Sequence, residues 1–169
     1  MSANAYEVRP LNPTRNGLPA MSRLQAADLL NRRLADAIDL QCQCKQAHWN
    51  VKGDQFISLH ELFDEIHGEV AEYVDRLAER VVQLGGTAEG TVRVAAERSE
   101  LDEYPVRMWK GADHIRCLSL ALAAFGSRVR FAVQGMDELE DVVSADLCAE
   151  IASGIDQSLW FVEAHAQEN

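Results

Sequence analysis

Four side chains of types that bind transition metals lie on one face of a single predicted helix. His60 and Asp64 are four residues apart, and so are Asp75 and Glu79 further along the same segment. At about 100° per residue, these positions fall within roughly a 100° arc of an α-helix. An imidazole and carboxylates grouped in this way, with apolar neighbours, are typical ligands of a transition-metal site.

The distance between the two pairs excludes a metal site made by one copy of this helix. Asp64 and Asp75 are eleven residues apart, which is about 16 Å along the helix axis. Two copies packed antiparallel about a two-fold axis would instead place His60 and Asp64 of one chain opposite Asp75 and Glu79 of the other. Gly68 lies beside the midpoint, where two backbones can approach closely. The spacing therefore predicts two identical metal sites shared across a dimer interface.

Two long helices and a short turn must position these residues. Apolar residues recur at helical intervals from residue 22 to about 51, and again from about 54 to 84. Ser22, with Gln25 three residues later, forms a capping-box pattern at the start of the first helix. Gly85, after the second helix, suits a left-handed helix cap. This part of the chain is therefore predicted to be an antiparallel helical hairpin.

The second half of the chain predicts another pair of helices. Helical periodicity returns over residues 112–136 and 145–163, after a long crossover, residues 87–110, that contains a short helical stretch at residues 92–98. A crossover of this length joins helices that are not antiparallel neighbours. The predicted fold is all-α, a four-helix bundle with a short helix in the crossover between helices two and three.

Residues 135–147, between the last two helices, are predicted to form an acidic turn that includes Asp137, Asp141 and Asp146. In most proteins such a turn is a solvated loop that adds favourable charge at a helix N-terminus. Repeated around a symmetry axis of an oligomer, the same acids would instead line a pore that attracts cations. The sequence permits both interpretations.

The order and spacing of these motifs resemble one protein family. KQAHWN, residues 45–50, ends the first predicted helix, H-x-x-x-D and D-x-x-x-E follow on the second, and GGTAEGT, EYP and LWFVEA match further along. The pattern is similar to that of the Dps family, the mini-ferritins named as DNA-binding proteins from starved cells. The prolines, Asn and Gly of residues 1–21 predict an extended arm. The resemblance implies a ferritin-like bundle over residues 22–166 and assembly into a hollow dodecamer. In such a shell Asp137, Asp141 or Asp146, repeated around a three-fold axis, would line a pore for iron entry.

The resemblance also implies a ferroxidase, an oxidoreductase that acts on iron. The family's iron ligands correspond to His48, His60, Asp64, Asp75 and Glu79 of this chain. In that scheme the histidines come from one chain and Asp75 and Glu79 from its partner, while Asp64 acts through a water. Trp49 matches a tryptophan that donates an electron near the iron. The family oxidises Fe(II), often with hydrogen peroxide, and stores the ferric mineral, which protects DNA from oxidative damage.

Charge favours a protein that handles metal over one that binds DNA. The net charge is −11, and residues 1–21 contain only Arg9 and Arg15 as basic residues. Because phosphate contacts need a basic patch or tail, we do not expect direct DNA binding. An acidic protein instead attracts cations. The alternatives are a nucleoid-associated protein that binds and condenses DNA directly, with metal only structural, and a plain helical bundle whose histidines and acids are surface groups.

Nothing in the sequence predicts a membrane or secreted protein. There is no run of eighteen or more apolar residues, and the N-terminus lacks the pattern of a secretory signal. The four cysteines have no C-x-x-C spacing, and we expect them to be reduced. These features predict a cytoplasmic protein, with nucleoid association as one possible location and no membrane partner.

Overall fold

Five α-helices and no β-strand make up residues 11–167, the part of the chain that the computed structural model describes. The four long helices are α1 (Ala20–Asn50), α2 (Phe56–Gln83), α4 (Gly111–Glu138) and α5 (Val142–Ala164). The short helix α3 (Val92–Arg98) lies in the connection between α2 and α4, at the residues that the sequence predicts. No helix within residues 11–167 is long and apolar enough to cross a membrane.

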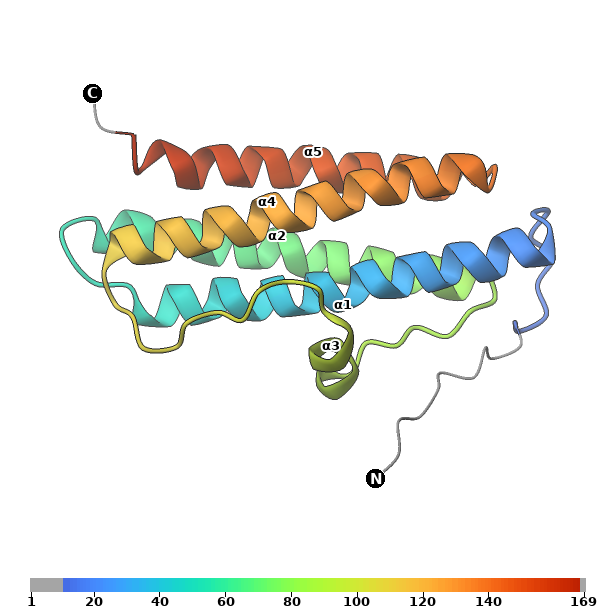
Figure 1. Cartoon of the computed structure of the whole chain (residues 1–169), viewed down its shortest axis with the longest axis horizontal. Helices are drawn as coiled ribbons and strands as arrows, with labels where there is room; N and C mark the ends of the chain where they lie inside the picture. Colours follow the sequence, from blue (N-terminus) through green and yellow to red (C-terminus); the bar gives the residue numbers. More distant parts are fainter. Residues whose placement is uncertain (1–10, 168–169) are drawn as a thin grey trace.

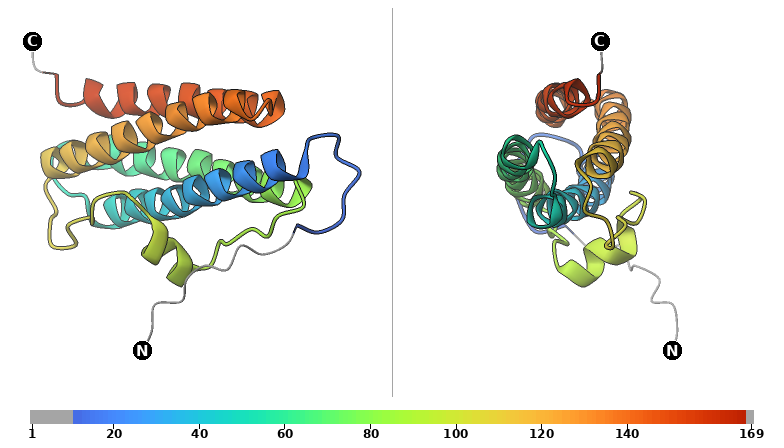
Figure 2. Two further views of the ribbon diagram at one scale, coloured as in Figure 1. Left: turned by 45° about the vertical axis from the view of Figure 1, so that its right-hand side comes forward. Right: turned by 90° about the vertical axis from the view of Figure 1, so that its left-hand side faces the viewer.

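The long helices form two hairpins that pack into a four-helix bundle. α1 pairs with α2 and α4 pairs with α5, while α3 lies outside the bundle against α1 (Figure 1). The end-on view in Figure 2 shows the four long helices around a common axis. Their facing sides bury a continuous apolar core whose largest members include Leu34, Leu59, Phe63, Leu118 and Phe125. The predicted all-α four-helix bundle is confirmed.

Hydrogen bonds from polar residues of α1 fasten the crossover to the bundle. The buried Asn31 amide donates to the backbone carbonyl of Thr87 over 3.1 Å, and its Oδ1 accepts from the backbone N–H of Glu89 over 3.0 Å. Further along α1, Gln43 Nε2 donates to the carbonyl of Asp102 over 3.1 Å. Because buried polar groups are costly unless they are hydrogen-bonded, these contacts fix the path of the crossover over α1.

The first helix begins earlier than the sequence predicts. α1 starts at Ala20, no side chain caps it, and Ser22 lies inside its first turn, so the predicted capping box does not form. The Arg23 guanidinium makes the local anchor instead, because it donates to the carbonyl of Leu84 at the end of α2 over 3.0 Å. The last two residues of the predicted arm, residues 1–21, therefore belong to α1, and its first ten residues lie outside the described residues.

The acidic turn between the last two helices is shorter than predicted. α4 and α5 both extend into it, so that Asp137 and Asp146 lie within helices and residues 139–141 alone connect them. Asp141 is the N-cap of α5, and its Oδ1 accepts a hydrogen bond from the backbone N–H of Ser144 over 3.1 Å. A side chain that satisfies a free N–H in this way starts a helix, which explains the earlier start of α5.

Candidate metal centre

His48, in the last turn of α1, and His60, in the first turns of α2, face each other across the hairpin. Their rings are stacked, with centroids 3.7 Å apart and planes at 22°. Nδ1 of His48 lies 2.8 Å from the backbone oxygen of His60, and Nδ1 of His60 lies 2.8 Å from the backbone oxygen of His48. Each imidazole is therefore held by a hydrogen bond to the backbone oxygen of the other histidine.

This reciprocal contact fixes the tautomer of both rings. A carbonyl oxygen can only accept, so Nδ1 of His48 and of His60 must each carry the proton and donate. In the neutral imidazole the lone pair then lies on Nε2. A histidine that donates one ring N–H to a backbone carbonyl and offers the other nitrogen is the usual form of a metal ligand. The two rings are prepared to bind a cation.

Asp64 lies one turn after His60 on α2, and its carboxylate is already engaged. Lys45 of α1 forms an ion pair and a hydrogen bond with Asp64. The hydrogen bond from Lys45 is the main cause that lowers the pKa of the Asp64 carboxyl, which is therefore ionised at neutral pH. Lys45 was not predicted from the sequence as part of the site. The available signal was its place in KQAHWN, three residues before His48.

Asp75 and Glu79 lie on the C-terminal half of α2, away from the two histidines. Both are exposed. Within residues 11–167 of one chain, no three His, Cys, Asp or Glu side chains come together in a way that could hold a metal ion. One protomer thus brings His48 and His60 together, but neither Asp64 nor the second carboxylate pair completes a metal site with them.

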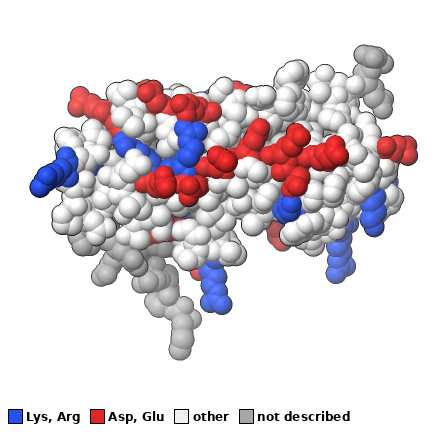
Figure 3. Space-filling model, turned by 180° about the vertical axis from the view of Figure 1, so that it is seen from behind, with Lys and Arg blue, Asp and Glu red and all other residues white. Residues whose placement is uncertain are grey.

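The outer face of α2 is open around Gly68, between the histidine end of the helix and the end that carries Asp75 and Glu79. A Cβ built on Gly68 would meet no atom within 4 Å. Figure 3 shows this side of the molecule, where a band of acidic side chains follows the helix. The exposed acids of α2 are Glu61, Asp64, Glu65, Glu69, Glu72, Asp75 and Glu79. A line of negative charge on a surface raises the local concentration of cations.

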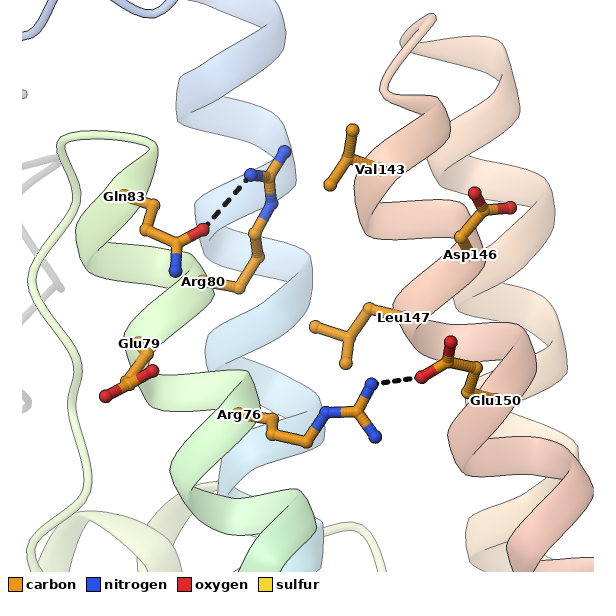
Figure 4. Close-up of a pocket in the computed structure, with 8 residues that line it drawn as sticks. All are labelled: Arg76, Glu79, Arg80, Gln83, Val143, Asp146, Leu147 and Glu150. Carbon is orange, nitrogen blue, oxygen red and sulfur yellow. Dashed lines mark hydrogen bonds and ion pairs between the residues drawn. The ribbon is translucent and has the colours of Figure 1, made fainter.

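Glu79 stands at the edge of a pocket of about 360 Å³ between α2 and α5 (Figure 4). Arg76 on α2 pairs with Glu150 on α5 across this pocket, and Leu147 fills the space between the helices. Figure 4 shows Glu79 turned away from α5, toward the outside of the bundle. Its carboxylate is therefore presented outward, where it is available to another molecule.

The three acids proposed for an iron-entry pore have different surroundings. Asp137 and Asp146 are exposed. Asp141 is buried, accepts a hydrogen bond from Arg80 Nη2 over 2.8 Å, and also accepts one from the Ser144 hydroxyl. A buried carboxylate that pairs with an arginine and caps a helix is not exposed to a pore. The prediction that Asp141 lines the pore is therefore wrong.

Trp49 is the first residue after His48, and 66% of its side chain is exposed. The Trp49 side chain is exposed to solvent in the isolated protomer, although the preceding residue, His48, faces α2. The location fits a group that acts close to the imidazoles or at an interface that covers them.

Comparisons with known proteins identify the family of this chain. The family model described as a ferritin-like domain matches residues 27–168. A DNA protection during starvation protein of Agrobacterium fabrum is 41% identical over 155 residues, which cover 92% of this chain and 96% of that protein. A protein of the same name from Mycolicibacterium smegmatis is 32% identical over 151 residues, which cover 89% and 82% of the two chains.

Solved structures match over almost the whole chain. The Dps of Mycobacterium smegmatis superimposes with a TM-score of 0.88 at 32% identity, covering 93% of this chain and 94% of that one. DpsC from Streptomyces coelicolor gives a TM-score of 0.91 at 28% identity, covering 99% and 98%. With the bundle, the paired histidines and these relatives together, the chain belongs to the Dps family of ferritin-like proteins.

Proposed function

We propose that this protein oxidises Fe(II) at sites shared between two protomers and stores the ferric product in a hollow, twelve-subunit shell. The observation that carries the proposal is the reciprocal contact of His48 and His60, which leaves both Nε2 atoms free for a cation. Iron is the substrate and cargo of these sites. Removal of Fe(II) together with peroxide would protect DNA without contact with it.

The register of α2 supports completion of each site by a second copy. His60 and Glu79 are symmetric about the point between residues 69 and 70, and so are Asp64 and Asp75. An antiparallel two-fold pairing of α2 with its copy about that point brings each histidine end against a carboxylate end. One further pair obeys the same relation: Ile57, 60% exposed, is symmetric with Val82, 57% exposed.

This apolar pair gives the dimer a reason to adopt that register. Ala78, Val82 and Ala88 line a largely apolar cavity of about 430 Å³ beside Glu79. In the antiparallel pairing, Ile57 of the partner subunit reaches this cavity. Burial of such side chains stabilises the contact by about 1.5–3 kcal/mol each. The apolar contact then closes the outer end of each metal site.

The proposed ligand set suits iron oxidation. The imidazoles of His48 and His60 face Asp75 and Glu79 from the second copy, and negatively charged oxygens attract Fe(III) more strongly than Fe(II). Two Fe(II) ions supply the two electrons that reduce one hydrogen peroxide, with two protons, to two waters. We assign Asp64, already paired with Lys45, to hold a water beside the iron, and Trp49 to donate an electron there.

The test is anaerobic Fe(II) titration of the native oligomer, followed by peroxide and measurement of ferric absorbance. We expect saturable binding and rapid oxidation, and loss of both in His60→Ala and in Glu79→Gln. His165→Gln, which changes a histidine at the end of α5, is the matched control and should behave as wild type. Oxidation at the rate of buffer in the wild-type oligomer would refute the ferroxidase function.

A mixing experiment tests whether each site is shared. A dimer of one His60→Ala protomer and one Glu79→Gln protomer has one site with both defects and one intact site. Random reassembly of the two variants should therefore restore about one quarter of the wild-type sites, because half of the dimers are mixed. If each chain carried its own complete site, mixing would restore no activity.

Protection of DNA without direct binding has its own test. Real phosphate contacts weaken steeply with salt, so a gel-shift titration at low salt is the most sensitive condition. We expect no shift of duplex DNA by the oligomer at low salt, given the net charge of −11 and the acidic band of α2. A salt-sensitive shift would instead support the nucleoid-binding alternative.

A further inference from the structure

A buried tyrosine and histidine form a hydrogen-bonded pair inside the bundle that the iron site does not use. Tyr104, in the crossover after α3, is 8% exposed, and His114, in the first turn of α4, is 1% exposed. The Tyr104 hydroxyl lies 2.8 Å from Nδ1 of His114. Within residues 11–167, Nε2 of His114 is buried without a hydrogen bond of good geometry, although the backbone of Met108 interacts with the imidazole and acts to raise its pKa. A polar group in that position calls for a chemical explanation.

The direction of this hydrogen bond follows from which polar atoms of Tyr104 and His114 would otherwise lack a partner. If the hydroxyl of Tyr104 donates to Nδ1 of His114, only the N–H at Nε2 lacks a hydrogen bond of good geometry. With the opposite direction, the phenolic hydrogen and the Nε2 lone pair would both be buried and unsatisfied. Tyr104 is therefore the donor. Burial also lowers the pKa of the His114 imidazole, which keeps the ring neutral and its Nδ1 lone pair available.

The pair lies on the inner side of the histidine half of the metal site. Phe63, one turn after His60 on α2, contacts His114 with ring centroids 6.3 Å apart. Burial raises the pKa of the Tyr104 phenol, and the nearby thiols of Cys117 on α4 and of Cys44 on α1, one turn before His48, raise it further. Tyr104 thus lies behind both helices that present the imidazoles.

We propose that Tyr104 is a redox-active tyrosine that gives one electron to the iron site while its phenolic proton moves to Nδ1 of His114. The proposal rests on the proposed function, since iron and peroxide supply the oxidising power. When a site holds a single Fe(II), that ion gives peroxide one of the two electrons required. Tyr104 gives the second. Peroxide and two protons from water become two waters, Fe(II) becomes Fe(III), and the pair becomes a neutral tyrosyl radical beside an imidazolium.

Burial makes the proton step necessary. The low-polarity surroundings raise the pKa of Tyr104 strongly, so the phenol does not ionise before it is oxidised. A phenol that loses an electron becomes a strong acid, and His114 is the base within hydrogen-bond distance. Because the imidazolium is buried, the proton returns to the phenolic oxygen when the radical is reduced. The device would prevent release of a hydroxyl radical from a half-loaded site.

The test uses the native oligomer, loaded anaerobically with one Fe(II) per site, mixed with peroxide and frozen for electron paramagnetic resonance. We expect a tyrosyl radical in the wild type, whose hyperfine splitting changes when the protein contains ring-deuterated tyrosine. Tyr104→Phe should lose the signal and release more hydroxyl radical to a spin trap. Tyr73→Phe is the matched control, because Tyr73 is half-buried on α2 without an imidazole partner, and should keep the signal.

A second variant separates proton transfer from packing. In His114→Gln the amide oxygen still accepts the hydrogen bond from Tyr104, but an amide is not a base at neutral pH. Loss of the radical in this variant supports the proton step, and retention of the wild-type signal overturns it. Ferric absorbance without a tyrosyl signal in the wild type overturns the role of Tyr104 alone. Absence of both signals means that the proposed iron site itself fails.

Discussion

Arg80 and Asp141 form a buried ion pair that joins the end of α2 to the start of α5. Arg80 Nη2 donates to Asp141 Oδ1 over 2.8 Å, and Arg80 Nε donates to the Ser144 hydroxyl over 2.8 Å. The two charged side chains are only 10% and 1% exposed. Arg80 directly follows Glu79, so the pair also holds the backbone that carries a proposed iron ligand.

Removal of either charge should be costly, because the other remains buried without a partner. Arg80→Met strands the Asp141 carboxylate, and Asp141→Asn strands the Arg80 guanidinium while it keeps an oxygen to cap α5. Breaking a buried pair in this way costs about 3–5 kcal/mol. In a chain of this length each kcal/mol lowers the melting temperature by about 2–4 °C, so each single variant should melt about 6–20 °C lower.

The double variant is the decisive measurement. Arg80→Met with Asp141→Asn leaves no uncompensated charge, so its loss of stability should be smaller than the sum of the single losses by about 1–3 kcal/mol. Melting followed by circular dichroism at a fixed protomer concentration gives all four values, since assembly affects them equally. Strictly additive losses of stability would contradict a buried ion pair. So would single variants that melt within about 2 °C of wild type, which corresponds to a loss of no more than about 1 kcal/mol. Slower iron uptake in Asp141→Asn at unchanged stability would instead support the prediction that Asp141 lines the iron-entry pore.

Three further changes test the packing, the titration and the interface. Gly154→Ala would place a Cβ 1.9 Å from the Tyr73 hydroxyl oxygen, so thermal unfolding should show a loss of about 1–3 kcal/mol, partly relieved by Tyr73→Phe. Burial raises the pKa of Cys44 from 9.0 to about 12. The unfolded thiol therefore loses its proton first, and stability should fall from pH 9 upward by as much as about 1.4 kcal/mol per pH unit. Cys44→Ala should flatten that fall in urea titrations at pH 8–11. Ile57→Glu should dissociate the oligomer in sedimentation velocity, whereas Val92→Glu, at an exposed position of α3, should not.

Apolar periodicity predicted the helices because it depends on local geometry alone. A 3.6-residue repeat fixes which residues share a helix face, whatever the helix packs against. The short helix at residues 92–98 and the left-handed cap at Gly85, with φ of 89°, were predicted for the same local reason. The exposure of Asp64, Asp75 and Glu79 on one side of α2 also follows from their spacing, whereas His60, at the edge of the same arc, faces α1.

Features that depend on contacts between distant residues were not predictable. The pairing of Lys45 with Asp64 and the reciprocal bonds of His48 and His60 need the relative register of α1 and α2. Sequence spacing does not contain that register. The burial of Asp141 had the same cause, because its partner Arg80 is 61 residues away. An acidic residue next to a turn looks solvated until the arginine that neutralises it is located.

The imidazole half and the carboxylate half of the proposed site differ in how far a single protomer fixes their geometry. His48 and His60 are fixed by hydrogen bonds within the protomer, so the imidazole half needs no rearrangement on assembly. Asp75 and Glu79 are exposed on α2, and their place opposite the imidazoles depends on the partner alone. A site built in this way gains its carboxylates, and with them its preference for Fe(III), only when two protomers associate. Iron oxidation should therefore be linked to assembly: any binding of Fe(II) that requires both halves also stabilises the dimer by the same free energy. Variants that weaken the α2 contact should lose iron affinity although every ligand is present, and saturating Fe(II) under anaerobic conditions should restore their association.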